Sequence, residues 1–97
     1  MKFHLSDQQR RHLDDFCKRH YIVRLAFFGS VLTDAFHEGS DVDVLVEFDP
    51  EHVPGWSFFS LPDELEAILG RKVDLTTPAG LHPYIRDNVF ASAKTII

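Results

Sequence analysis

The stretch that decides the fold is residues 28–48, with the sequence F-GS-VLTDAFHEGS-DVD-VLVEF. A Gly-Ser pair follows a hydrophobic segment, and ten residues later Asp-x-Asp opens a second hydrophobic run, residues 42–48. The alternation in this run predicts a β-strand with two distinct faces. One face carries Val42, Val44, Val46 and Phe48, and the other carries Asp41, Asp43, Leu45 and Glu47. Both aspartates therefore lie on the same side of the start of the strand.

The segments before this stretch predict a helix followed by a strand. Ser6 and Gln9 fit a capping box, and apolar residues recur at three- and four-residue spacing through residues 6–20, which predicts a helix. Residues 21–28, YIVRLAFF, are rich in β-branched and aromatic side chains and predict a buried strand. The Gly-Ser pair ends this strand, and residues 31–36 are long enough for a short helix.

The segments after it predict two further helices and one short strand. We expect a helix within residues 58–69, best defined from residue 63, a strand over residues 72–76, and a helix over residues 84–93. The inward face of the last helix is expected to carry Ile85, Val89 and Phe90. Helices and strands thus alternate, which predicts a single α/β (α+β) domain over residues 1–97, with a small mixed β-sheet flanked by helices.

The composition limits the class of protein. The 97 residues are 44% hydrophobic and 26% charged, with a formal net charge of -5, as in one small globular domain. No run of about 18 apolar residues and no apolar leader is present, so we expect no membrane span and a cytoplasmic location. The basic residues are few and dispersed, which argues against autonomous binding to nucleic acid or to a membrane surface. The single cysteine, Cys17, excludes an internal disulfide.

Two features of the deciding stretch indicate phosphate chemistry. Gly29 and Ser30 follow a strand and open a short helix, so backbone amides and a hydroxyl can cradle a phosphate, although a plain turn is the alternative. Asp41 and Asp43 would repel each other by about 4 kcal/mol at ~4 Å and an effective dielectric of about 20, or by ~1 kcal/mol if both face water. A divalent cation between them would remove this repulsion, and hard carboxylate oxygens suit Mg²⁺.

Asp74 supplies a third carboxylate. It lies in the short predicted strand over residues 72–76, with Val73 and Leu75 on the opposite face. If this strand neighbours the one that begins near Asp43, all three carboxylates meet. Such a set suits two-metal phosphoryl transfer, or one metal ion together with a general base. Taken alone, Asp74 is more typical of an ordinary strand-edge residue than of a metal ligand.

Together these residues resemble the signature of the minimal nucleotidyltransferases of the DNA polymerase β superfamily: Gly-Ser, ten residues, Asp-x-Asp. The resemblance extends to FFGSV, SDVDVLVEF, LGRKVDLTT and LHPYIRDNVF, and so covers nearly the whole chain. It implies the polymerase-β-like nucleotidyltransferase fold. It also implies transfer of a nucleotidyl group from ATP, with one or two Mg²⁺ ions, onto an acceptor hydroxyl.

The resemblance assigns roles to individual residues. Asp41 and Asp43 would hold the metal ions, and Asp74 would complete the metal site and help to activate the acceptor. Gly29 and Ser30, together with Ser40, would bind the nucleotide. The smallest relatives are often antitoxins whose partner is a HEPN-domain ribonuclease toxin, and the activity implied is transfer of AMP onto a tyrosine of that toxin, which silences it.

One departure from the family pattern keeps a second function open. Many relatives carry a basic residue three or four positions after the Gly-Ser pair, where this chain has Thr33 and Asp34. A catalytically weak or inactive module that masks the toxin by direct contact is therefore the alternative. A small-molecule nucleotidyltransferase or a DNA polymerase is disfavoured, because 97 residues leave no room for an acceptor-binding or template-binding domain.

Two further groups of side chains have competing interpretations. Trp56, Phe58 and Phe59 beside a Pro-Gly loop either cap the core or form an exposed patch for a protein partner. The six histidines are scattered, with no pair at ligand spacing on one predicted helix face, so we expect surface or core-edge positions for them.

Overall fold

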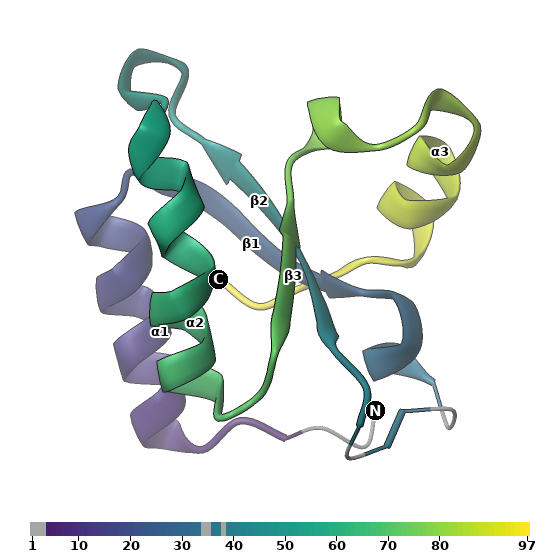
Figure 1. Cartoon of the computed structure of the whole chain (residues 1–97), viewed down its shortest axis with the longest axis horizontal. Helices are drawn as coiled ribbons and strands as arrows, with labels where there is room; N and C mark the ends of the chain where they lie inside the picture. Colours follow the sequence, from purple (N-terminus) through teal and green to yellow (C-terminus); the bar gives the residue numbers. More distant parts are fainter. Residues whose placement is uncertain (1–3, 34–35, 38) are drawn as a thin grey trace.

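A four-stranded mixed sheet forms the centre of the computed structural model, which describes residues 4–33, 36, 37 and 39–97 (Figure 1). The strand order is β3-β2-β1-β4. The strands are β1 (Ile22–Phe28), β2 (Val42–Phe48), β3 (Val73–Thr76) and β4 (Lys94–Thr95). β1 is antiparallel to β2 and β4, whereas β2 is parallel to β3, so the predicted mixed sheet is confirmed.

Three α-helices flank the sheet: α1 (Asp7–Arg19), α2 (Leu61–Leu69) and α3 (Pro83–Ser92). The predicted capping box begins α1, because the Gln9 amide donates to Ser6 Oγ at 3.1 Å and the Ser6 amide donates to Gln9 Oε1 at 2.9 Å. α2 ends at Gly70, whose left-handed conformation (φ 70°) suits glycine. Among the described residues, no helix has the length and apolar character needed to span a membrane.

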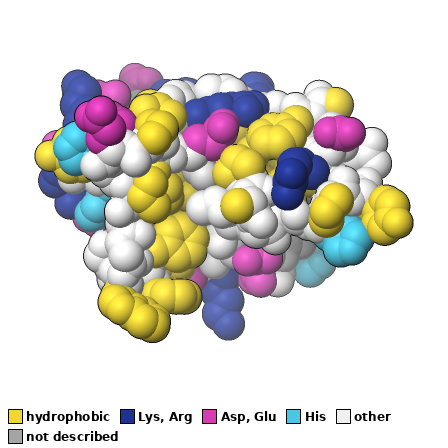
Figure 2. All heavy atoms as spheres, turned by 90° about the horizontal axis from the view of Figure 1, so that it is seen from above, with side chains coloured by type: hydrophobic (Ala, Val, Ile, Leu, Met, Phe, Trp, Pro, Cys, Tyr) yellow, Lys and Arg dark blue, Asp and Glu magenta, His cyan; other side chains and the backbone are white. Residues whose placement is uncertain are grey.

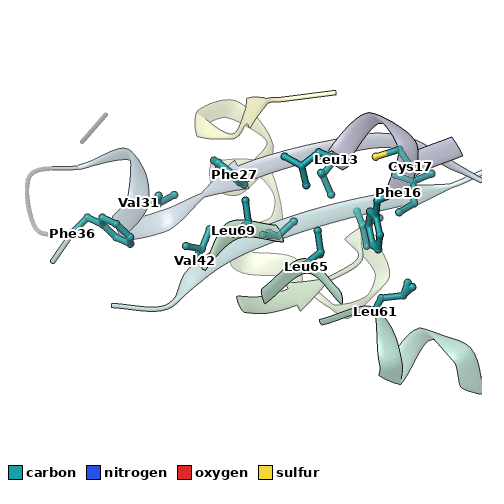
Figure 3. Packing of buried hydrophobic residues seen from close by; sticks show 14 residues of the cluster. Leu13, Phe16, Cys17, Phe27, Val31, Phe36, Val42, Leu61, Leu65 and Leu69 are labelled. Carbon is teal, nitrogen blue, oxygen red and sulfur yellow. The ribbon is translucent and has the colours of Figure 1, made fainter. Parts of the chain in front are cut away.

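The hydrophobic core lies mainly between the sheet and the pair α1 and α2, as the close-up in Figure 3 shows. The helices contribute Leu13, Phe16, Cys17, Leu61, Leu65 and Leu69, and β2 contributes Val42, Val44 and Val46. On the other face, Ala26, Leu45 and Leu81 form a smaller cluster with Val89 and Phe90 of α3. The alternation predicted for β2 is therefore confirmed, and Asp43 shares the face of Leu45.

Burial also defines the state of the single cysteine. Cys17 is 3% exposed within the main core. Burial, followed by the nearby charge of Asp14, raises the pKa of its thiol to about 12. The residue therefore acts as a small apolar core side chain and not as a reactive thiol.

Four local details differ from the predictions. The short helix predicted over residues 31–36 is the 3₁₀ turn η1 (Gly29–Leu32). The start of the helix predicted over residues 58–69 is another 3₁₀ turn, η3 (Trp56–Ser60). The two-residue strand β4 is too short to leave a periodic pattern. Ile85 is 49% exposed, because α3 is covered only along the edge that carries Val89 and Phe90.

An ion-pair cluster joins α1 to α2 on the outside of the core. The Glu64 carboxylate accepts from Arg19 Nη2 at 2.6 Å and lies 2.8 Å from His20 Nε2. Burial alone would raise the pKa of Glu64, but the hydrogen bonds from Arg19 and His20 outweigh it, so the pKa is lowered. The ionised form of Glu64 is therefore favoured by folding.

Replacing Glu64 by Gln is expected to lower the free energy of unfolding at pH 7 by about 0.5–1 kcal/mol, the scale of a partly exposed pair. Because the pKa is lowered on folding, the carboxylate stabilises the fold above its unfolded-state pKa, and this contribution disappears as the pH falls through the folded-state pKa. Urea denaturation should show the full difference at pH 7 and a progressively smaller one as the pH falls below the unfolded-state pKa. The exposed neighbour Asp63→Asn is the control, and a difference that does not shrink as the pH falls below the unfolded-state pKa would contradict this account.

Candidate active site

Two of the three predicted aspartates lie side by side on adjacent strands. Asp43 on β2 and Asp74 on β3 are partners in the parallel register. Neighbouring strands lie about 4.8 Å apart, and partners in register point to the same face, so the two carboxylates are held side by side. Asp41 comes directly before β2, at the same end of the sheet. In Figure 1 this is the end where β3 and β2 begin and β1 leads into η1.

The electrostatics of Asp43 report the proximity of all three carboxylates. Its pKa is raised first by burial, then by the charge of Asp74 and then by that of Asp41. Asp43 is half-buried, whereas Asp41 and Asp74 are exposed. All three effects raise the pKa of Asp43, so desolvation and repulsion both disfavour its ionised form in the folded protein.

Gly29 brings the backbone of the Gly-Ser turn against the Asp43 carboxylate. Phe28, the residue before it, pairs with Asp43 across the antiparallel β1–β2 ladder. Gly29 has φ 75°, and a Cβ added there would overlap Asp43 Oδ2 and lie 3.3 Å from Asp43 Cγ. Only glycine satisfies both the left-handed backbone and this close approach. We call Gly29, Asp41, Asp43 and Asp74 the aspartate site.

The turn that contains Ser30 is shorter than the sequence predicts. η1 has four residues, which gives little helix dipole, so any phosphate cradle there must rely on individual amides and the Ser30 hydroxyl. Thr33 takes the position where many family members have a basic residue. Its amide and its hydroxyl both donate to Ser30 O at 2.9 Å, which closes the turn. Asp34, the other unusual residue, lies outside the described residues.

Ser40 shapes the loop that leads to Asp41. Its hydroxyl oxygen accepts from the His37 amide at 3.1 Å, and its own amide donates to His37 O at 2.9 Å. The hydroxyl acts as an acceptor in this bond and retains one proton to donate. The geometry thus gives Ser40 a role in folding the loop, and its predicted contact with a nucleotide stays a prediction.

The aspartate site offers the donors that a hard divalent cation prefers. Within the described part of the chain, no group of three or more His, Cys, Asp or Glu side chains is placed so that it could hold a metal ion by itself. Mg²⁺ does not need one, because it keeps several waters and takes one or two carboxylates together with substrate phosphates. A half-buried carboxylate flanked by two exposed ones at an open sheet edge fits that pattern. The donor set is therefore compatible with Mg²⁺.

Two residues hold this end of the sheet in roles that the sequence did not indicate. Arg71 Nη2 donates to His37 O at 2.5 Å and to Ser40 O at 3.2 Å, and its guanidinium lies 4.5 Å from the centre of the Phe36 ring. Glu66 Oε2 accepts from the Val73 amide at 3.2 Å, at the start of β3. Because Arg71 lies 31 to 34 residues from its backbone partners, no local pattern could have identified its role.

Of the aromatic residues Trp56, Phe58 and Phe59, which follow β2, one caps the core and two are exposed. Phe58 is partly buried against the core, with its ring 6.2 Å from that of Phe48. Trp56 and Phe59 are 89% and 70% exposed. Figure 2, which shows the molecule from above, has hydrophobic side chains exposed in separate groups at the left, the side of the β2–α2 loop in Figure 1, and at the right, the side of α3. The prediction of a core cap thus holds for Phe58, and the other two rings are available to a partner.

Comparisons with known proteins agree with this geometry. The protein-family model described as "Nucleotidyltransferase domain" matches residues 9–96 of this chain. The chain is 37% identical over 82 residues to "Putative protein adenylyltransferase MJ1379" of Methanocaldococcus jannaschii, which covers 82% of both chains. It is 35% identical over 79 residues to protein adenylyltransferase MntA of Thermococcus cleftensis, covering 80% of this chain and 78% of that protein.

Solved structures share the fold. A structure described as a "putative minimal nucleotidyltransferase" is 35% identical, with a TM-score of 0.72 over 88% of this chain and 86% of that one. A toxin–antitoxin complex with AMP-PNP has a TM-score of 0.72 at 18% identity, over 91% of this chain and 72% of that one. The complex of a tri-AMPylated Shewanella oneidensis HEPN toxin with MNT antitoxin has a TM-score of 0.65 at 15% identity, over 92% of this chain and 69% of that one. The predicted fold is therefore confirmed.

Proposed function

Because the chain belongs to the nucleotidyltransferase domain family, we propose that it is a Mg²⁺-dependent protein adenylyltransferase that acts as an antitoxin. Its substrate is ATP, and its acceptor is a hydroxyl, a tyrosine, on a HEPN-domain ribonuclease toxin that the modification neutralises. The observation that carries the proposal is the pairing of Asp43 with Asp74 in register, with Gly29 packed against the Asp43 carboxylate.

The relatives support the identity of donor and acceptor. Two of them are named as protein adenylyltransferases, which fits a protein acceptor. Among the structural neighbours, one toxin–antitoxin complex holds the ATP analogue AMP-PNP, and another contains a HEPN toxin with three AMP groups. The proposal assigns the same donor and the same class of acceptor to this chain. It places the reaction in the cytoplasm, which supplies ATP and keeps a lone thiol reduced.

The chemistry follows from the donors at the sheet edge. Asp41, Asp43 and Asp74 would hold Mg²⁺, which when bound neutralises phosphate charge and orients the attacking and leaving oxygens. The acceptor oxygen attacks the α-phosphorus in line, the bond to the bridging oxygen breaks, and pyrophosphate leaves. The proton of the acceptor hydroxyl passes to a carboxylate, for which exposed Asp74 is our candidate.

The remaining residues bind and orient the nucleotide. Gly29 lets the turn approach the triphosphate without a Cβ in the way, and the Ser30 hydroxyl donates to a phosphate oxygen. Ser40 holds the loop before Asp41 and can donate its remaining proton to the nucleotide. Together these groups bring the α-phosphorus next to the carboxylates.

We expect this protein, incubated with ATP, Mg²⁺ and its proposed HEPN-domain partner, to add one or more AMP units to that partner. Intact-mass spectrometry of the partner measures the product directly. The variant Asp41→Asn/Asp43→Asn is the control and should give no adduct. An equal adduct from this variant would refute the assignment of the aspartate site.

Exposed Trp56 and Phe59 favour one alternative, a module that masks the toxin by contact. Under that function the two proteins would form a stable complex without any adduct. The Asp41→Asn/Asp43→Asn variant would then still inhibit the ribonuclease. The same mass measurement, combined with a ribonuclease assay, therefore separates modification from masking.

A further inference from the structure

Arg71 is the cation that ties the loop before Asp41 to the start of β3. Its guanidinium donates to the carbonyl oxygens of His37 and Ser40 and lies over the ring of Phe36. Phe36 is 8% exposed and belongs to the main core. The three contacts lock the guanidinium between a buried ring and two backbone acceptors on the same loop.

We propose that Arg71 is a positioning residue that orients Asp41 toward the divalent cation. The carbonyl of Ser40 belongs to the planar peptide whose nitrogen is that of Asp41. A hydrogen bond to Ser40 O therefore fixes the plane from which the Asp41 backbone departs. On the other side, the Val42 amide donates to Lys72 O at 2.8 Å, so Asp41 is held from before and after.

The contacts require arginine and not merely a positive charge. A guanidinium presents several donors in a flat fork and stacks on an aromatic face, whereas an ammonium is a compact point charge. Lysine at position 71 would keep the charge but lose the combination of two carbonyl contacts and the ring contact. Positioning and simple electrostatics therefore make different predictions for Arg71→Lys.

Positioning and simple electrostatics also predict opposite changes in metal affinity for Arg71→Gln. A cation repels a divalent metal ion, so electrostatics alone predicts that removing the charge of Arg71 would strengthen metal binding. If Arg71 positions Asp41, its removal weakens metal binding. Lys72 is the matched control, because it is the next residue, carries the same charge and has an exposed side chain.

The test measures Mn²⁺ binding to the whole protein by electron paramagnetic resonance, with Mn²⁺ in place of Mg²⁺. We expect Arg71→Lys and Arg71→Gln each to weaken binding by about 10-fold and to lower kcat/KM for AMP transfer by about 10- to 100-fold. The KM for the partner protein should not change. Lys72→Gln should leave each quantity within about twofold. Circular dichroism and thermal melting check that the variants are folded.

The inference rests on the proposed function, and a second measurement separates their failures. Hydrogen exchange followed by NMR reports the Ser40 amide, which donates to His37 O in the same loop. We expect its exchange to accelerate at least about 10-fold in Arg71→Lys and to stay unchanged in Lys72→Gln. If the wild-type protein binds no Mn²⁺ and transfers no AMP, the proposed function fails, and this exchange rate still decides whether Arg71 holds the loop.

Two results would overturn the role of Arg71. One is wild-type Mn²⁺ affinity and wild-type Ser40 exchange in Arg71→Lys, which would show that only the charge matters. The other is tighter Mn²⁺ binding in Arg71→Gln, which would show that electrostatic repulsion outweighs any positioning. Weakened binding in both variants, with Lys72→Gln unchanged, supports it.

Discussion

Replacing Asp43 by Asn is expected to lower AMP transfer by at least about 10²- to 10³-fold while the protein stays folded. Asp43 is the central carboxylate of the aspartate site. Its register partner is Asp74, and the charges of Asp74 and Asp41 both raise its pKa. Asparagine keeps the size of the side chain but removes the charge that a divalent cation needs. Mass spectrometry of the partner protein over a time course measures the loss.

The same substitution is expected to maintain or raise the melting temperature of the protein without metal. Burial, Asp74 and Asp41 raise the pKa of Asp43 on folding, so the ionised carboxylate disfavours the folded state. That unfavourable contribution develops as the pH rises above the unfolded-state pKa, and it is complete above the folded-state pKa. The stability of the wild-type protein relative to Asp43→Asn should therefore fall with rising pH across this window, because the shared contribution of Glu64 cancels in the comparison.

The combination of lost activity and unchanged or higher stability distinguishes a functional carboxylate from a structural one. The exposed helix residue Asp87 provides the control, since Asp87→Asn removes one negative charge away from the sheet edge. It should transfer AMP like the wild-type protein. Transfer by Asp43→Asn at a rate close to that of Asp87→Asn would sink the assignment of the aspartate site.

The sequence was sufficient to predict the layers and the position of the aspartates. Alternation in β2 separates Val42, Val44 and Val46 from Asp43 and Leu45, and the capping box at Ser6 defines the start of α1. Both signals are local, because they depend on the two-residue repeat of a strand and on four residues at a helix start. Their success shows that local periodicity decides which face of the sheet carries the carboxylates.

What could not be predicted depends on contacts between distant segments. The register of Asp43 with Asp74 needs the parallel pairing of β2 and β3, whose residues are separated by the whole of α2. The bonds from Arg71 to the carbonyl oxygens of His37 and Ser40 have the same origin. The extent of η1 and the exposure of Ile85 depend on which neighbours cover them. Tertiary packing, and not propensity, determines these features.

Replacing Gly29 by Ala is expected to cause the second large loss of transfer, by about 10²-fold or more. The new methyl group would overlap the Asp43 carboxylate, so Asp43 must leave its position or the turn must move away. Either movement separates the nucleotide-binding turn from the aspartates. Displacements of about 1 Å are enough to cost that factor in a reaction that depends on alignment.

Gly70 provides a matched control for the backbone part of this effect. It has φ 70°, close to the φ of 75° at Gly29, but a Cβ at Gly70 would meet no atom within 4 Å. Gly70→Ala should therefore show only the left-handed strain, about 1–2 kcal/mol in the free energy of unfolding, with transfer unchanged. The excess loss of stability in Gly29→Ala over Gly70→Ala measures the collision with Asp43.

A double-mutant cycle tests whether that collision is with the carboxylate itself. In an Asp43→Ala background the Oδ2 and Cγ atoms that a Cβ at Gly29 would meet are absent, and the nearest remaining Asp43 atom is Cβ at 3.6 Å, an ordinary contact. Gly29→Ala should then cost no more stability than Gly70→Ala does in the same background. If the excess loss of stability in Gly29→Ala is as large in this background, glycine is required only for the backbone conformation of the turn. A vanished excess would mean that it serves the junction between the turn and the carboxylate, on which the proposed chemistry depends.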